Sequence, residues 1–328
     1  MNFSKMLFPR TAMILFLCHH LLSPAQAIET TSNAIDISLA DISRANLDAF
    51  SSTRYSAAVL PLVGRYQLAG TGLVQFQDTG FDDWRLNAAA IDSNTGPLAM
   101  GAFLQYSTGN AALEGDALPG WKLPEESLER EFSDLVVGGG TAVSFLNRKI
   151  GLGMNGAYYA RTYITASDEG INQLAFWQED TDISKVQKIE LNGSVAAKLS
   201  DELVLVGGIN DWLGVSDARY PYLSARISAV DAPMRGAYRS YGGVEVDLET
   251  MISAEGFSMH YAGISGDILI GSQVSLRGGY RYDFAAQQQV PGLGFGLDDG
   301  KISLDYGLGL VFGSQIGHRH ALGVRFRL

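Results

Sequence analysis

The stretch Lys301-Ile-Ser-Leu-Asp-Tyr-Gly-Leu-Gly-Leu-Val-Phe312 alternates between two kinds of residue. Apolar side chains occupy its even-numbered positions, whereas serine, aspartate and glycine occupy the odd-numbered positions from 303 to 309. Successive side chains of a strand point to opposite faces, so the stretch predicts a β-strand with one apolar and one polar face. The pattern resumes after Gly317 and continues to Leu328. A soluble β-sandwich shows the same alternation, but closing strands of this kind are typical of bacterial transmembrane barrels, which turn the apolar face to lipid.

Similar segments, separated by turn residues, recur from Arg65 to the end of the sequence. With the pair described above they give fourteen strands, the first twelve at 66–76, 84–91, 98–106, 132–145, 150–164, 188–199, 203–212, 220–229, 238–249, 257–270, 273–284 and 292–297. We therefore expect an all-β fold, a transmembrane antiparallel β-barrel of about fourteen strands.

The even number of strands predicts which connections face which side of the membrane. Short connections at 93–96, 146–149, 200–201, 271–272 and 298–300, with a longer one at 230–237, are expected on the periplasmic side. The insertions at 107–130 and 165–186 are then expected outside the cell. This distribution matches the short inner turns and long outer loops of bacterial barrels.

Residues 1–27 have the pattern of a secretory signal peptide. Lys5 and Arg10 precede and flank an apolar run, and Ala25-Gln-Ala27 offers a small-x-small cleavage site. The only cysteine, Cys18, lies in this segment, so neither a disulfide nor a thiolate metal site is expected. We expect an exported protein of the outer membrane with no cofactor and no metal.

Residues 28–62 differ from the rest of the chain, because their apolar residues follow no single period. We interpret them as a periplasmic segment or a plug, ahead of a barrel over 63–328. The alternative is an additional barrel strand near 54–61, which Pro61 would end and which would make the strand number odd.

The composition is compatible with a barrel. Charged residues make up 18% of the chain, and it contains 38 glycines and 14 tyrosines. Glycine suits curved strands, and tyrosine suits the aromatic girdles at the membrane interfaces. The formal charge of −11 argues against a nucleic-acid partner. We expect contacts with outer-membrane lipid and lipopolysaccharide, and recognition of the last strand by the barrel assembly machinery.

Charged residues alternate with apolar ones along several predicted strands and are therefore expected in the lumen. One interpretation is a ladder of ion pairs, and the other is a basic lining that attracts an anionic head group. The residues are Arg277, Arg281, Asp283, Asp305, Arg325, Arg327, Glu245 and Asp247.

Apolar residues also occur in the two predicted outer insertions, where exposed loops do not require them. They either pack on one another or form a landing site for a hydrophobic ligand. The candidate ligand-binding residues are Leu118, Trp121, Leu123, Ile171, Leu174, Phe176 and Trp177.

Histidine offers little support for an enzyme. Ser258 and His260 would lie on one face of a strand, but no third group that could orient the histidine is evident, so a membrane hydrolase is only a remote alternative. His318 and His320 are expected at the outer rim, where lipopolysaccharide phosphates could contact them.

The last third of the chain resembles a known family. The segments Gln273-Val-Ser-Leu-Arg-Gly-Gly-Tyr-Arg-Tyr-Asp283, Pro291-Gly-Leu-Gly-Phe-Gly-Leu297, Lys301-Ile-Ser-Leu-Asp-Tyr306 and His318-Arg-His-Ala-Leu-Gly-Val-Arg-Phe326 look like the closing strands of FadL-type outer-membrane barrels, particularly of the PorV-like branch. The resemblance covers residues 257–328, and the glycine-rich opening and Asn-Pro-Ala turn of the family are missing from 28–62.

This resemblance implies a fourteen-stranded barrel with an N-terminal hatch that passes hydrophobic molecules. For the PorV-like branch it implies a role in secretion or surface attachment. The leading functional hypothesis is a channel for fatty-acid-like or aromatic molecules. The alternative is a barrel that acts as a partner in secretion, assembly or surface attachment.

Overall fold

The computed structural model describes residues 33–45, 52–64, 66–77, 82–93, 98–113, 128–165, 183–213, 218–230, 240–254, 256–270, 273–313 and 316–328. Apart from Leu113, these residues belong to one compact unit. The signal peptide predicted for residues 1–27 lies outside the described ranges.

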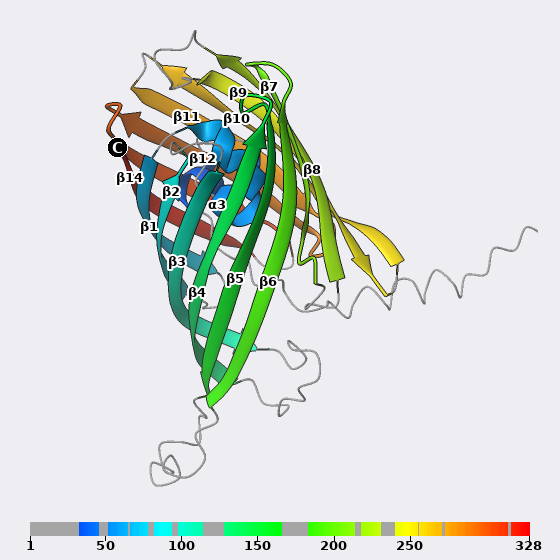
Figure 1. Cartoon of the computed structure of the whole chain (residues 1–328). Coiled ribbons are helices and arrows are strands. Elements are labelled where there is room, and N and C mark those ends of the chain that lie inside the picture. Colours follow the sequence, from blue (N-terminus) through cyan, green and yellow to red (C-terminus); the bar gives the residue numbers. More distant parts are fainter. Residues whose placement is uncertain are drawn as a thin grey trace, which may run out of the picture. The chain divides into compact units, whose positions relative to one another are not determined.

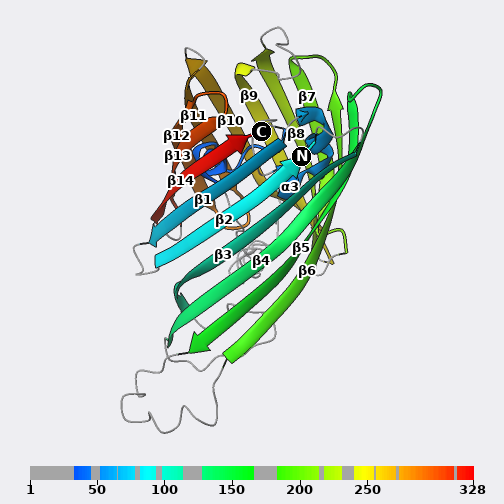
Figure 2. The ribbon, with the colours of Figure 1, turned by 60° about the vertical axis from the view of Figure 1, so that its left-hand side comes forward.

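Fourteen antiparallel strands form a closed barrel in which each strand pairs with its neighbours in sequence and β1 pairs with β14 (Figures 1 and 2). The strands are β1 (Tyr66–Gln77), β2 (Asp82–Asp92), β3 (Leu98–Leu113), β4 (Leu128–Phe145), β5 (Ile150–Thr165), β6 (Ile183–Lys198), β7 (Leu203–Asn210), β8 (Ala218–Val230), β9 (Ser240–Ser253), β10 (Gly256–Ile270), β11 (Val274–Asp283), β12 (Gln288–Asp298), β13 (Ile302–Val311) and β14 (Gly317–Arg327). The predicted fold class and strand number are confirmed.

The two faces of the wall follow the alternation seen in the sequence. In β13, Ile302 and Leu304 are exposed, whereas Ser303 and Asp305 are buried on the opposite face. Large apolar side chains are exposed in the same way on strands around the whole barrel, for example Leu223 and Leu322. An apolar exterior around a polar interior is the arrangement of a barrel that spans a lipid bilayer.

Some strands extend further than predicted. β3 continues to Leu113, β4 begins at Leu128 and β6 begins at Ile183, so the connections at 114–127 and 166–182 are shorter than the predicted insertions. We attribute the difference to the strand ends beyond the bilayer, where lipid no longer requires an apolar face and the alternation fades. The predicted tight turn after β4 is present, with left-handed backbone at Leu146, Asn147 and Arg148.

The described part of the N-terminal segment is helical. It contains α2 (Ala34–Ser38), α3 (Ser52–Tyr55), the 3-10 helix η1 (Ala57–Val59) and α4 (Leu60–Val63). Asn33 caps α2, since its side chain accepts hydrogen bonds from the backbone N–H groups of Ile35 and Asp36. The alternative of a strand at 54–61 was wrong, and Pro61 lies in the first turn of α4, where it costs no hydrogen bond. Within the described ranges no helix is both long and apolar enough to cross a membrane.

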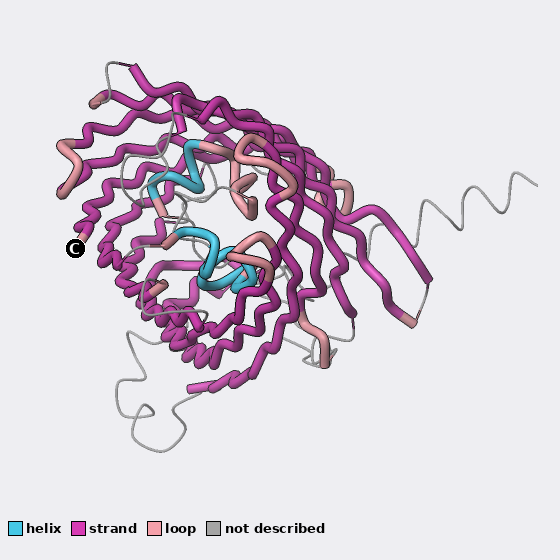
Figure 3. The backbone as a smooth tube through the Cα atoms, turned by 45° about the horizontal axis from the view of Figure 1, so that its top comes forward, coloured by secondary structure: helices cyan, strands magenta, loops and turns pink. Residues whose placement is uncertain are grey.

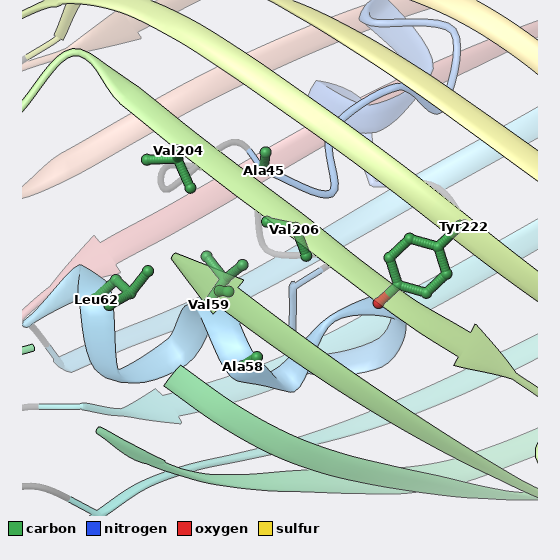
Figure 4. Close-up of a cluster of buried hydrophobic side chains, with 8 residues drawn as sticks. Ala45, Ala58, Val59, Leu62, Val204, Val206 and Tyr222 are labelled. Carbon is green, nitrogen blue, oxygen red and sulfur yellow. The ribbon is translucent and has the colours of Figure 1, made fainter. Parts of the chain in front are cut away.

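These helices lie inside the ring of strands (Figure 3). α2 packs against β11, β12, β13 and β14, whereas α3, η1 and α4 pack against β4 and β5. Ala58, Val59 and Leu62 form an apolar cluster with Val204, Val206 and Tyr222 of the wall (Figure 4). The described N-terminal residues thus fill part of the lumen from two opposite sides.

Candidate functional site

Inward-facing glycines of the wall make room for the N-terminal segment. A Cβ atom added at Gly151 would overlap the carbonyl group of Ala58, and one added at Gly279 would overlap the main chain of Leu39. The helices therefore rest directly on the backbone of the strands. From the sequence we expected glycine in the strands to serve curvature, and this contact was not predicted.

A cluster of charged side chains connects the N-terminal segment to β9. The Arg44 guanidinium donates to Glu249 at 2.5 Å and to Asp247 at 3.5 Å. Its Cζ lies 4.1 Å from the centroid of the Tyr222 ring. The backbone N–H of Ala45 donates to Glu245 at 2.7 Å. Burial alone would lower the pKa of Arg44, but the facing carboxylates raise it well above its ordinary value. The guanidinium therefore stays charged in the lumen.

A second cluster surrounds Arg54, and the ring of Tyr55 lies between it and the first, 5.2 Å from Cζ of Arg54 and 5.8 Å from Cζ of Arg44. Nη2 of Arg54 donates to the hydroxyl of Tyr159 at 2.8 Å, and that hydroxyl donates to Glu190 at 2.8 Å. The amide nitrogen of Asn155 donates to the carbonyl oxygen of Arg54. These contacts join α3 to β5 and β6.

A third contact lies after α2. Asp41 forms ion pairs with Arg281 at 3.5 Å and with Arg319 at 3.7 Å. The hydroxyl of Ser265 also donates to the carbonyl oxygen of Ile42 at 2.6 Å. Buried charges that are paired and hydrogen-bonded hold such a segment in one position, because removing one partner leaves the other uncompensated.

A cavity of about 820 Å³, open to its surroundings over most of its extent, lies at the wall beside this segment. Its lining comes from β1 to β6 near the end of the barrel where β1 begins and β2 ends, together with Leu328. Four of the lining residues are glycines, so the backbone itself forms part of the cavity surface. These are Gly101, Gly139, Gly140 and Gly156.

Residues of both faces of the wall border this cavity. Gln67, Ile91 and Asn155 belong to the buried, inward-facing set and are at most 4% exposed. Leu68, Met100 and Met154 belong to the outward-facing set and are 46–55% exposed. Residues of the inward-facing and of the outward-facing set therefore both contribute to its lining, which is mainly apolar, as is usual for sites that bind small molecules.

The predicted lumen charges lie in the wall as follows. Asp305 accepts from Arg325 at 2.7 Å and forms an ion pair with Arg277 at 2.8 Å, and Asp298 pairs with Arg327. Glu245, Asp247 and Arg281 face the N-terminal segment as described above, and Asp283 accepts from the backbone N–H of Ala286 at 2.9 Å. The structure places these charges in ion pairs and hydrogen bonds, and none of them lines the wall cavity.

The predicted outer-loop residues, Leu118, Trp121, Leu123, Ile171, Leu174, Phe176 and Trp177, lie outside the described residues. Their role as ligand-binding residues stays a prediction.

The histidines lie in different surroundings. His260 Nδ1 is 2.7 Å from Glu249 Oε1, while Ser258 is exposed. His318 stacks on Phe76, and His320 Nδ1 is 2.7 Å from the hydroxyl of Tyr306, all on the outward face of the barrel. Among the described residues, no group of three or more His, Cys, Asp or Glu side chains could hold a metal ion.

Comparison with known proteins identifies the fold. No family model and no curated protein matches the sequence. Solved structures do match: the Ralstonia pickettii toluene transporter TbuX (TM-score 0.61, 11% identity, 90% of this chain and 98% of that chain) and a Pseudomonas aeruginosa FadL homologue (0.59, 10%, 90% and 98%). The CymD monoaromatic hydrocarbon channel also matches (0.61, 9%, 90% and 96%). The resemblance to FadL-type barrels is confirmed at the level of the fold, and the PorV-like branch stays a prediction.

Proposed function

We propose that this barrel is an outer-membrane channel for hydrophobic small molecules. The observation that carries the proposal is the apolar cavity bordered by both faces of the wall. In this proposal a hydrophobic molecule that has entered the lumen passes through the wall at this cavity and reaches lipid without crossing the periplasm. The structures that share this fold include channels described as carrying toluene or monoaromatic hydrocarbons, which supports the proposal.

In this proposal the N-terminal segment is a hatch. The clusters at Asp41, Arg44 and Arg54 keep it in the lumen, and its backbone rests on glycines of the wall. By filling part of the lumen the segment hinders polar solutes, and the wall cavity beside it provides the route for apolar ones. The apolar residues of the two outer insertions are the proposed capture site.

The test is a substitution that fills the cavity. Ala90 lines it and is exposed on the outward face of β2, whereas Ala88 is exposed on the same face of the same strand but does not line it. We expect Ala90→Phe to reduce the uptake of the apolar fluorescent probe N-phenyl-1-naphthylamine by intact cells at least severalfold, because the ring occupies the route. Ala88→Phe is the matched control and is expected to take up the probe at the wild-type rate.

Equal uptake by both variants would overturn the proposed route. Uptake by the wild type no faster than by cells without the protein would overturn the proposed function. Specific retention of a secreted or outer-membrane protein, together with no probe uptake, would favour the alternative of a secretion or assembly partner.

A further inference from the structure

We propose that His318 and His320, on the outward face of β14, form a binding site for a divalent transition-metal ion, Cu²⁺ or Zn²⁺. One position separates the two residues, so their side chains belong to the same face of the strand. They are the second and fourth residues of β14, close to the end of the barrel that is predicted to face outside the cell. The inference is independent of the proposed function, because neither histidine lines the wall cavity.

The two imidazole rings lie close enough to bind the same ion. Their centroids are 5.1 Å apart and their planes are almost perpendicular, at 87°. Two imidazoles that bind one ion tetrahedrally, at metal–nitrogen distances of about 2.0–2.1 Å, have centroids roughly 5 Å apart. The observed spacing of the rings is therefore the spacing that shared binding requires.

Tyr306 of β13 orients the ring of His320. Nδ1 of His320 is 2.7 Å from the hydroxyl of Tyr306. When Nδ1 carries the proton and donates it to this hydroxyl, Nε2 has the lone pair that a metal ion binds. Histidine ligands almost always have such a hydrogen bond on their second nitrogen, which fixes the ring and raises its basicity. Tyr306 is therefore a positioning residue of the site.

Phe76 of β1 holds the ring of His318. The two rings are stacked, with centroids 5.0 Å apart and an angle of 27° between their planes. Stacking occupies the face of an imidazole and leaves its nitrogens, which lie at the ring edge, accessible. The side chain of His318 is exposed, and its contacts within the described residues are with other rings. This nitrogen donor is therefore available from the outside of the barrel.

The donor atoms determine the kind of ion. Imidazole nitrogen suits Cu²⁺ and Zn²⁺, whereas Mg²⁺ and Ca²⁺ prefer oxygen. Among the described residues no third His, Cys, Asp or Glu side chain completes the group, so water supplies the remaining ligands. The expectation of no metal rested on the lack of cysteine in the mature chain, and an imidazole site does not require cysteine.

The experiment titrates Cu²⁺, Zn²⁺ and Mg²⁺ into the exported full-length barrel in detergent, purified without a histidine tag, and follows binding by isothermal titration calorimetry. We expect one Cu²⁺ per chain, bound more tightly than Zn²⁺, and no binding of Mg²⁺. In His318→Ala and in His320→Ala, which each keep one imidazole, the affinity for Cu²⁺ is expected to fall by about tenfold or more.

Two further variants separate the ligands from the residue that positions them. Tyr306→Phe keeps both imidazoles and is expected to weaken Cu²⁺ binding by about tenfold, as the loss of a hydrogen bond to a metal ligand does. His260→Gln is the matched control, because His260 contacts Glu249 and lies apart from the pair. Its affinity for Cu²⁺ is expected to equal that of the wild type. Circular dichroism checks that every variant is folded.

Electron paramagnetic resonance of the bound Cu²⁺ then counts the coordinated imidazoles. We expect two in the wild type, in Tyr306→Phe and in His260→Gln, and at most one in each single alanine variant. A single coordinated imidazole in the wild type, an affinity unchanged by both alanine substitutions, or binding of Mg²⁺ as tight as that of Zn²⁺ would overturn the inference. An affinity unchanged by Tyr306→Phe would overturn the role assigned to Tyr306.

Discussion

Arg44 lies where acidic side chains of β9 face the lumen. Asp247 and Glu249 are both buried, and Arg44 is the cation from the N-terminal segment that contacts them. The acidic residues could be assigned to the lumen from the sequence, because they alternate with valine and leucine. Their partner could not be identified, since Arg44 lies about two hundred positions away in a segment without a clear period.

Arg44→Met is therefore expected to destabilise the protein. Removing one partner of a buried ion pair costs about 3–5 kcal/mol, because Asp247 and Glu249 lose the arginine that compensates them and remain buried. The measurement is the free energy of unfolding from urea titration in detergent, followed by circular dichroism. Lys149→Met, in an exposed turn, is the control and is expected to change this free energy by about 0.5 kcal/mol or less. An equal, small effect of both substitutions would show that the Arg44 cluster does not hold the segment.

At the scale of the element, strands were easier to predict than the contacts between them. The alternation in β13 and β14 is a local property, because each lipid-facing position needs an apolar side chain whatever lies elsewhere in the chain. The glycines of the strands, by contrast, did not indicate which contacts they make. A glycine in a strand is compatible with curvature, with a bulge or with close approach of another backbone, and only the folded chain shows that Gly279 has the third role.

Substitutions at two neighbouring glycines of β11 test whether Gly279 is needed for the close approach of the N-terminal segment. Gly279→Val would push its side chain into the main chain of Leu39, whereas the atom nearest to a Cβ at Gly278 is a methyl group of Leu293 at 3.6 Å, an ordinary contact. We expect Gly279→Val to cost about 1–3 kcal/mol and to displace α2. Limited proteolysis followed by mass spectrometry should then show faster cleavage within residues 33–45 in Gly279→Val than in Gly278→Val or the wild type. Identical cleavage in all three proteins would contradict the packing of α2 on β11.

At the scale of the whole molecule, the barrel was predictable and the cavity was not. The strand number and the order of hairpins follow from the sequence pattern alone, as the closed sheet confirms. The cavity arises where six strands come together, so no motif in one stretch could indicate it. The predicted ligand-binding residues were chosen from outer insertions because apolar residues in loops are conspicuous, and they lie outside the described residues.

The central claim is that hydrophobic molecules leave the lumen through the wall cavity while the N-terminal segment stays in place. A disulfide can hold the segment, because a Cβ atom at Gly323 would lie 3.3 Å from that of Ala34, close to the spacing of roughly 3.5–4.5 Å found in disulfides. The only other cysteine, Cys18, lies in the predicted signal peptide.

The decisive measurement is probe uptake by intact cells that carry the double variant Ala34→Cys/Gly323→Cys, under oxidising and reducing conditions. The account predicts that N-phenyl-1-naphthylamine enters at the wild-type rate in both states, because the route through the wall does not require α2 to move. Uptake that stops on oxidation and returns on reduction would contradict it, and would show that the segment itself must leave the lumen.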